Sequence, residues 1–585
     1  MAPVGATIKI IDQWEQWIAE QWNSDVYEDA LRNVDSTIQP IVDRLTLPTG
    51  CGQIEMEPEK ASQTLRECIG AITDELIRWA QGYPSIRWLW MLRRVPDHVF
   101  SGRLASTAGY DSTLAEVISG ASNCNRQDIL LKDYEAVYFR VDKLVLRRLA
   151  RFCVAVRYLS DRHSDYRWAG KGASIIFHRN TPPTIKVSEE IKACVRIYDQ
   201  RVASALNRLN RVGTVTVSGD PMSGLNSILW VHQIKLVDMP VPRPTNPMPG
   251  VPDCEEIIVP CRFLSEPLPL EGLNNLLSDD RIDPQSVIKR EVATLILLMF
   301  CLYILVSKHS AGFKSLMSRG YLLWANRSTA LKTIDVVLAD PIEGIRPFIQ
   351  IAGLTTTDEL LDSLESMTGK AWPLVGGPVV RQVEDGVCFD FAAATKRLEA
   401  LFEFPAVQGT VANARSLHFE KSVQSIIDKS AWKPGAELEA VRGKTLILNG
   451  AKLTDIDAIG HKDSALLIVS CKATIYSGLY DIGEYKIIRN ISTLVRDART
   501  HWDGIEAALM KSPVGDNYDF SKFTQIISVV CTPNVAYTDE TTMMAVAAEG
   551  LPGVASAPEL SQWLDIPVGL IDLVHKEKKR GQVYR

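Results

Sequence analysis

The last third of the chain constrains the fold most, because from about residue 408 onward helical patterns alternate with short strand patterns. Helices show apolar residues at a spacing of three and four, whereas short β-branched runs bounded by turn residues indicate strands. The predicted segments, in chain order, are a helix over 414–430, strands over 444–448, 454–460 and 465–473, a helix over 483–511 and a strand over 524–531. This order, helix, strand, strand, strand, helix, strand, predicts an α/β domain over residues 406–585.

The preceding two-thirds of the chain read as mostly helical. We expect a helical N-terminal region over 1–215 and a helical middle region over 286–405. Between them, residues 216–285 include nine prolines from Pro240 to Pro269. Proline lacks the N–H that helices and central strands need, so we expect an extended connector or wrapped arm. The expected fold class is therefore mixed, mostly α-helical at first and α/β at the end.

The most apolar run, Val292–Val306, is 15 residues long. A membrane span needs about 20 such residues, so a buried core helix is expected, with a short membrane contact as the alternative. The first residues lack the basic and apolar regions of a secretory signal. Eleven cysteines are scattered singly, which is typical of reduced thiols. These features predict a cytoplasmic protein with no membrane association.

The chain has a net charge of −6, which makes general binding to nucleic acid unfavourable and requires a local basic patch instead. Residues 143–211 contain 15 Lys+Arg and 5 Asp+Glu, a local net of +10. Within and just before this stretch, Arg140, Lys143, Arg147 and Arg151 fall on one face of a predicted helix. Arg147 and Arg151 are candidate phosphate contacts, and the alternative is a solvated helix face or pairing with acids of another domain.

Residues 1–400 contain no phosphate-binding loop, dinucleotide-binding glycine motif, zinc-protease motif or serine-hydrolase motif. In the later segment TDIDAIG, strand alternation places Asp455 and Asp457 on one face. Adjacent carboxylates repel each other, and a divalent cation such as Mg²⁺ removes that repulsion. Lys472 ends the next apolar strand and could stabilise a developing anion. The alternative is a surface turn with both aspartates and the lysine solvated.

The motif TDIDAIG followed by LLIVSCKA, after a helix that carries a glutamate, resembles the PD-(D/E)xK superfamily of restriction-endonuclease-like nucleases. The resemblance covers roughly residues 408–540, and the order of the elements agrees with it as well. It implies an α-β-β-β-α-β core with Asp457 as the metal-binding aspartate and Lys472 as the catalytic lysine. Glu420 matches the accessory glutamate of the first helix, and Asp455 matches a second acid found in many relatives.

The sequence departs from this family at Ser470, where the motif has an acid. Some branches carry a neutral glutamine there. The resemblance implies Mg²⁺ or Mn²⁺ held by Asp457 and Glu420, with Asp455 and the main-chain oxygen near Cys471 as further ligands. Ser470 would contribute at most a neutral oxygen or a hydrogen bond to a bound water.

The predicted helix after the motif carries a second basic stripe. Lys486, Arg489, Arg496 and Arg499 fall within one face and could neutralise the phosphates of a duplex. The alternative is an ordinary amphipathic helix.

Together these features predict a metal-dependent endonuclease with double-stranded DNA as the expected substrate. The helical region would act as a sensor or recognition module, or bind a protein partner or a second copy of the chain. By analogy, this arrangement suits restriction or anti-phage defence. A degenerate nuclease fold that binds nucleic acid or protein without cutting is the alternative, and a purely structural terminal domain is a third.

Overall fold

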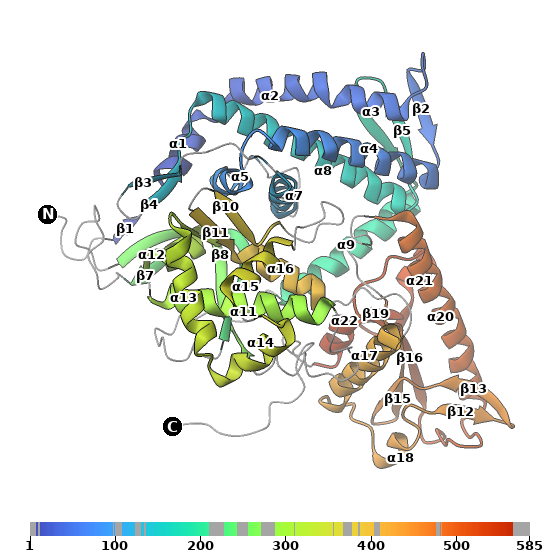
Figure 1. The fold of residues 1–585 in the computed structure, drawn as a ribbon. Coiled ribbons are helices and arrows are strands. Elements are labelled where there is room, and N and C mark those ends of the chain that lie inside the picture. Colours follow the sequence, from blue (N-terminus) through green and yellow to red (C-terminus); the bar gives the residue numbers. More distant parts are fainter. Residues whose placement is uncertain are drawn as a thin grey trace.

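The computed structural model describes residues 7–9, 12–96, 99, 108–122, 124, 130–133, 136–209, 227–242, 256–270, 287–308, 310–354, 356–366, 377–383, 386–402, 410–474, 480 and 483–565. Helices and several small sheets are mixed, as the sequence predicts. The N-terminal helices form one block, the middle region lies beneath it, and the C-terminal α/β part lies beside both (Figure 1).

The N-terminal block, residues 12–209, is built around two long helices, α4 (Pro58–Ala80) and α8 (Lys143–Gly170). Helix α8 begins where the Asp142 carboxylate accepts hydrogen bonds from the amides of Leu144 and Val145, both at 2.9 Å. The other helices are α1 (Gln13–Gln21), α2 (Ser24–Thr37), α3 (Gln39–Thr46), α5 (Ser85–Leu92), α7 (Ala108–Gly120) and α9 (Glu189–Leu209). Short strands that the sequence analysis does not predict pair between them: β2 (Gln53–Met56), β3 (Leu130–Asp133), β4 (Ala136–Phe139), β5 (Ser174–His178) and β6 (Thr181–Lys186).

The middle region is organised around α11 (Val287–Lys308), whose residues Val292–Leu302 are all buried. The prediction of a buried core helix is therefore confirmed. Among the described residues, no helix is long and apolar enough to cross a membrane. The remaining elements are α12 (Ser310–Arg319), β9 (Tyr321–Trp324), α13 (Arg327–Ala339), the 3₁₀ helix η2 (Glu343–Ile345), α14 (Arg346–Ala352), α15 (Thr357–Ser366), β10 (Val380–Val383), β11 (Gly386–Asp390) and α16 (Phe391–Phe402).

The proline-rich segment is not an unpaired connector where the structure describes it. Strands β7 (Ser227–Pro242) and β8 (Glu256–Pro269) form a long antiparallel ribbon, and β1 (Thr7–Lys9) adds to β8 in parallel. Prolines are tolerated because β7 is an edge strand and β1 covers only the first residues of β8. Residues 243–255, also in the predicted connector, lie outside the described residues.

The C-terminal part contains a four-stranded sheet in the order β14-β15-β16-β19, with β14 antiparallel to β15 and the other pairs parallel. Helix α17 (Thr410–Asp428) packs on one face and α20 (Tyr485–Lys511) on the other. The strands are β12 (Thr445–Leu448), β13 (Ala451–Asp455), β14 (Ala458–Lys462), β15 (Ala465–Cys471), β16 (Gln525–Thr532), β17 (Val546–Ala548), β18 (Leu551–Pro552) and β19 (Val554–Ser556), and the small helices are α18 (Ala436–Glu439), α21 (Glu540–Met544) and α22 (Ala557–Trp563).

The expected single strand over 454–460 is wrong, because the chain bends at Asp457. Strand β13 pairs with β12 in a separate hairpin, whereas β14 belongs to the four-stranded sheet. The amide of Ile456 donates to the carbonyl of Lys444 at 3.0 Å, which ends the hairpin ladder one residue before Asp457. The other predicted helices and strands of this region are confirmed with small shifts at their ends.

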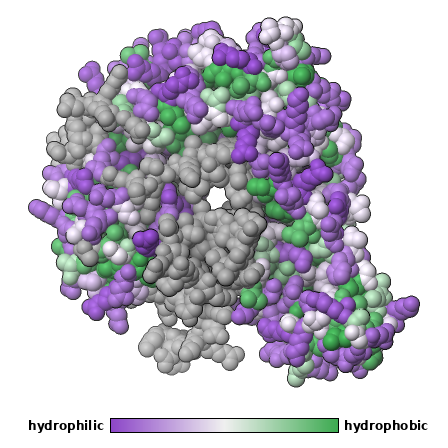
Figure 2. Space-filling model, turned by 45° about the vertical axis from the view of Figure 1, so that its right-hand side comes forward, coloured by the Kyte–Doolittle hydropathy of each residue, from purple (hydrophilic) through white to green (hydrophobic). Residues whose placement is uncertain are grey.

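The described surface is mostly hydrophilic on the face drawn in Figure 2, where hydrophobic residues gather in small separate patches. Large exposed apolar side chains, such as those of Leu144, Leu417 and Val546, lie on different elements.

Candidate active site

Asp457 lies in the bend between β13 and β14, beside the end of β15. Its Oδ2 accepts a hydrogen bond from the amide of Cys471 at 2.7 Å, and the Ser470 hydroxyl lies 3.4 Å from the same oxygen. Burial raises the pKa of the Asp457 carboxyl, although the Cys471 amide and the Lys472 ammonium act in the opposite direction. The carboxylate is thus fixed in orientation and poorly solvated.

Glu420 reaches the same place from α17. Burial raises the pKa of its carboxyl, and the nearby Asp457 raises it further, while Lys472 lowers it. Two neighbouring carboxyls with raised pKa values favour a bound cation, because a positive charge offsets both their repulsion and their lost hydration. The structure therefore brings together two of the carboxylates that the sequence analysis singled out.

Lys472 follows the last residue of β15 and is half-buried. Its amide donates to the carbonyl of Cys531 on β16 at 2.8 Å, so the backbone at the strand end is fixed by the sheet. Its charge acts on both Asp457 and Glu420. Glu420 comes from α17, Asp457 from the bend before β14, and Lys472 from the residue after β15.

Ser470 is 2% exposed on β15. Leu467, Val469 and Cys471 pack with α17, so strand alternation turns Ser470 toward the side of α20. Its hydroxyl can orient Asp457 but adds no negative charge. Burial raises the pKa of the Cys471 thiol well above its ordinary value, so the side chain stays a neutral thiol. The main-chain oxygen of Cys471 remains only a predicted metal ligand.

Asp455 lies on a different element from Asp457, contrary to the expectation that the two share one strand face. It lies on the β12–β13 hairpin with its side chain 54% exposed. Its carboxylate accepts a hydrogen bond from Thr445 and pairs with the Lys452 ammonium at 2.6 Å. The bend at Asp457 interrupts the alternation that the prediction assumed, although the charge of Asp455 still acts to raise the pKa of the Asp457 carboxyl.

Gln424 is a positioning residue that the sequence analysis missed. Its amide side chain is 1% exposed and bonds both backbone groups of Ile459, accepting from the amide and donating to the carbonyl, each at 2.9 Å. These bonds tie α17 to β14, one helical turn after Glu420 and two residues after Asp457. The sequence carried one signal for this role, namely a glutamine on the apolar side of a predicted helix. A side-chain amide that is buried there requires hydrogen-bond partners.

The basic stripe on α20 divides into two kinds of residue. Lys486 and Arg489 are exposed, and Arg496 is paired with its neighbour Asp497 at 3.3 Å. Arg499 is 7% exposed and donates to the Ser528 carbonyl and hydroxyl at 2.6 and 2.7 Å. The guanidinium of Arg499 therefore joins α20 to β16, and it is not exposed on the helix face where the phosphate contact was expected.

The other predicted stripe begins near the N-terminus of α8. Arg147 is exposed, whereas Arg151 pairs with Asp29 of α2 at 2.9 Å. Arg147 remains a candidate phosphate contact, and Arg151 is occupied within the helical block. Since 23 residues of α8 separate Arg147 from Gly170, the stripe is roughly 35 Å from the end of α8 nearest α20.

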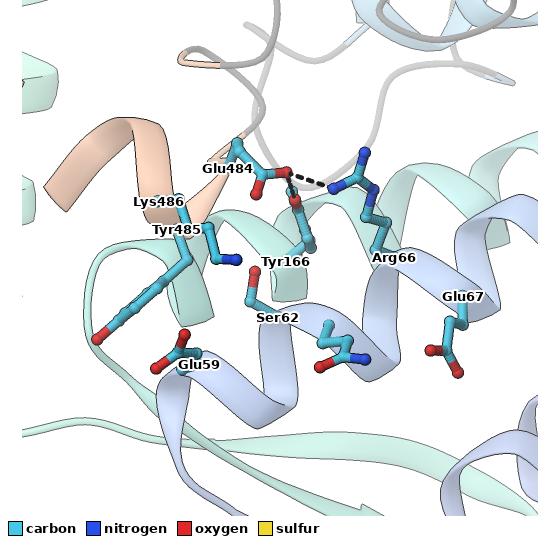
Figure 3. Close-up of a pocket in the computed structure, with 9 residues that line it drawn as sticks. Glu59, Ser62, Arg66, Glu67, Tyr166, Glu484, Tyr485 and Lys486 are labelled. Carbon is cyan, nitrogen blue, oxygen red and sulfur yellow. Dashed lines mark hydrogen bonds and ion pairs between the residues drawn. The ribbon is translucent and has the colours of Figure 1, made fainter. Parts of the chain in front are cut away.

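A pocket of about 400 Å³ opens where α4, α8 and the start of α20 meet (Figure 3). It is lined by Glu59, Ser62, Gln63, Arg66, Glu67, Tyr166, Glu484, Tyr485 and Lys486. The sequence analysis connected none of these residues except Lys486 with a site. Their sequence separation left no pattern that could have grouped them.

Within the part of the chain that the structure describes, no three His, Cys, Asp or Glu residues are grouped so that they could hold a metal ion. The Asp457–Glu420 pair supplies two carboxylates, which suits a hard cation that keeps several waters. No protein-family model, curated protein or solved structure matches the chain.

Proposed function

We propose that the chain is a metal-dependent nuclease that hydrolyses phosphodiester bonds, with double-stranded DNA as substrate and the cytoplasm as its location. The single observation behind this proposal is the convergence of Glu420, Asp457 and Lys472 at the end of β15. The resemblance to PD-(D/E)xK nucleases supports it through the same three residues. The order α17, β14, β15, α20, β16 supports it as well, with the β12–β13 hairpin in place of the first strand.

The proposed roles follow from the chemistry of each side chain. Asp457 and Glu420 would hold Mg²⁺ or Mn²⁺, which would supply a bound water of lowered pKa and a counter-charge for the phosphate. Lys472 would stabilise negative charge on the phosphate oxygen that the nucleophile approaches. Cys471, through its amide, and Ser470, through its hydroxyl, would keep the Asp457 carboxylate in a fixed orientation.

Of the predicted stripe on α20, Lys486 and Arg489 are exposed and make no ion pair among the described residues, and Arg489 donates a hydrogen bond to the Tyr485 hydroxyl at 3.2 Å. Exposed cations on one helix face can neutralise successive phosphates without reading the base sequence. The ten cysteines described by the structure are all free, which supports the cytoplasm as the compartment.

A second candidate function is a nuclease fold that binds nucleic acid or a protein without cutting. Ser470 favours it, because a neutral, buried residue stands where the family has a charged ligand. The experiment that separates the two candidates incubates the full chain with plasmid, linear duplex, single-stranded DNA and RNA. Each is tested with Mg²⁺, with Mn²⁺ and with a chelator. Cleavage that needs the metal supports the nuclease, whereas binding without cleavage supports the second candidate.

A further inference from the structure

The hairpin that leads to Asp457 contains an irregularity one residue before this aspartate. The Gly443 amide donates to the Ile456 carbonyl, whereas the Ile456 amide donates to the Lys444 carbonyl, both at 3.0 Å. Gly443 and Lys444 therefore face the single residue Ile456, which makes the irregularity a β-bulge. Gly443 has a φ of +68°, as the first residue of a glycine bulge requires. The backbone of Lys444 is thus bonded to the residue that precedes Asp457.

The chain on both sides holds this bulge in place. The Lys444 amide donates to the Val441 carbonyl at 3.1 Å, which closes a turn with Gly443 in its third position. Strand β12 begins directly after the bulge, where Thr445 pairs with Asp455. A bulge bends its strand and changes the direction of the side chains that it carries, and bulges recur next to active sites for that reason.

Lys444 is the cation of this region whose charge has no partner. The hairpin and the turn before it carry three cations, Arg442, Lys444 and Lys452. Arg442 pairs with Asp428 at 3.3 Å, and Lys452 pairs with Asp455 at 2.6 Å. Lys444 is exposed, and among the described residues its ammonium has no ion pair or hydrogen bond. An exposed ammonium of this kind can neutralise a phosphate of a bound nucleic acid.

We infer that Lys444 binds a phosphate of the substrate next to the one that is cut. This inference rests on the proposed nuclease function, because it takes Asp457 as the place of the reacting phosphate. Contacts to neighbouring phosphates fix the register of a nucleic acid on the protein and do not read its base sequence. Lys444 therefore acts on the binding of the substrate and not on the chemical step.

The test compares Lys444→Ala with Lys462→Ala in the full chain. Lys462 is also exposed and has no ion pair among the described residues, but it ends β14, about 17 Å along that strand from Asp457. Binding of a fluorescent duplex of about 20 base pairs is measured across a salt series in the presence of a chelator. Lys444→Ala should weaken binding by about five- to tenfold at about 0.1 M salt and reduce the slope of log affinity against log salt by about 0.9. Lys462→Ala should leave both unchanged.

Two further comparisons separate the charge from the bulge. Lys444→Arg keeps the charge, so it should bind the duplex as the wild type does. A Cβ on Gly443 would meet no atom within 4 Å, so the positive φ is what opposes a larger residue there. Gly443→Val should therefore weaken binding as Lys444→Ala does, whereas asparagine tolerates a positive φ and Gly443→Asn should bind normally. Wild-type binding by Gly443→Val would overturn the role of the bulge.

Steady-state cleavage provides the second measurement. In Lys444→Ala, KM should rise by about five- to tenfold with kcat changed less than about twofold, because the contact is made equally in the ground state and the transition state. The inference is overturned if Lys444→Ala and Lys462→Ala bind the duplex equally, or if kcat falls while KM is unchanged. Either result beside normal cleavage by the wild type leaves the nuclease function standing. If the wild type binds the duplex but cuts no nucleic acid with either metal, the proposed function fails and the binding comparison decides the role of Lys444. A wild type that binds no duplex overturns both.

Discussion

At the scale of single residues, Asp457 combines a fixed orientation with an unfavourable environment for its charge. Burial raises the pKa of its carboxyl above the ordinary value. A carboxyl of this kind contributes stability that is fully present below its unfolded pKa and is lost as the pH rises through the folded pKa. The ionised form therefore destabilises the metal-free protein at neutral pH.

Replacing Asp457 by asparagine should consequently raise the stability of the metal-free protein while it removes activity. The amide keeps an acceptor for the Cys471 N–H and carries no charge. We expect the free energy of unfolding to rise at neutral pH in the presence of a chelator. Denaturant unfolding of both proteins measures it. A loss of stability in the Asp457→Asn variant under these conditions would contradict the assignment of a desolvated carboxylate.

Ser470 tests the departure from the family motif. Ser470→Ala removes only a hydroxyl 3.4 Å from Asp457, so cleavage should fall by less than about tenfold. Ser470→Glu adds a carboxylate beside Asp457, which should lower the stability of the metal-free protein and increase the stabilisation by Mg²⁺. Thermal unfolding across a Mg²⁺ series measures both effects. An unchanged response to Mg²⁺ in Ser470→Glu would place position 470 outside the metal site.

At the scale of secondary-structure elements, α20 separates residues that are free for a ligand from residues that hold the helix in place. Arg489→Ala should weaken duplex binding and reduce the slope of log affinity against log salt by about 0.9. Arg499→Ala should instead lower stability by ~2–4 kcal/mol, because it leaves buried acceptors on Ser528 without their donor. Affinity across a salt series and denaturant unfolding separate the two. A salt slope that changes in Arg499→Ala but not in Arg489→Ala would reverse these assignments.

Helices α7 and α8 contain a pH-sensitive contact. Asp111 on α7 is 2% exposed, and burial raises the pKa of its carboxyl to about 6, against the opposing effect of the Ser160 hydroxyl. Because the folded pKa lies above the unfolded one, stability is lost as the pH rises from about 4 to about 6 and stays lower above that.

Asp111→Asn should therefore stabilise the protein by roughly 2–3 kcal/mol near pH 8 and by much less near pH 4. Unfolding free energies at the two pH values measure the difference. The Asp111 account fails if the gain is equal at both.

The elements show which parts of the fold are predictable from sequence. Regular periodicity located α17, β15, α20 and β16 because their apolar faces are continuous. The bend at Asp457 was missed, because Ile456 bonds to Lys444 in a turn that strand alternation cannot reveal. The β7–β8 ribbon was missed because a high proline content argues against strands. Composition does not show which strands lie at the edge of a sheet, where proline is tolerated.

At the scale of the whole molecule, buried charges join the N-terminal block to the middle region. Arg93 pairs with Glu116 and Asp390, and Arg381 also pairs with Asp390, which is 1% exposed. A second group links Asp12 and Glu15 of the first helix to Arg319. None of these pairs could be read from the sequence, because the partners are separated by between nine and about three hundred residues and show no periodic pattern.

The helical block also contacts the C-terminal part through α9. Arg201 makes two hydrogen bonds to the Glu559 carboxylate, at 2.7 and 2.9 Å, and one to the Val554 carbonyl at 2.7 Å. The predicted boundary near residue 215 lies outside the described residues, and the domain prediction did not include this packing of α9 on the C-terminal part. The candidate site was predictable in its residue types, since Glu420, Asp457 and Lys472 do converge, whereas the place of Asp455 on a separate hairpin and the internal bonds of Arg499 required the folded geometry.

The central claim is that Asp457, and not its neighbour Asp455, holds the metal for cleavage. The most direct measurement is the Mg²⁺ dependence of duplex cleavage by the wild type, Asp457→Asn and Asp455→Asn. Asp455 is a matched control, because its carboxylate is already bonded to Lys452 and Thr445 on a separate hairpin. We predict Mg²⁺-dependent cleavage by the wild type, a rate within about threefold of it for Asp455→Asn, and a loss of at least about 10³-fold for Asp457→Asn. Equal rates for Asp457→Asn and the wild type, or an inactive Asp455→Asn beside an active Asp457→Asn, would contradict the account.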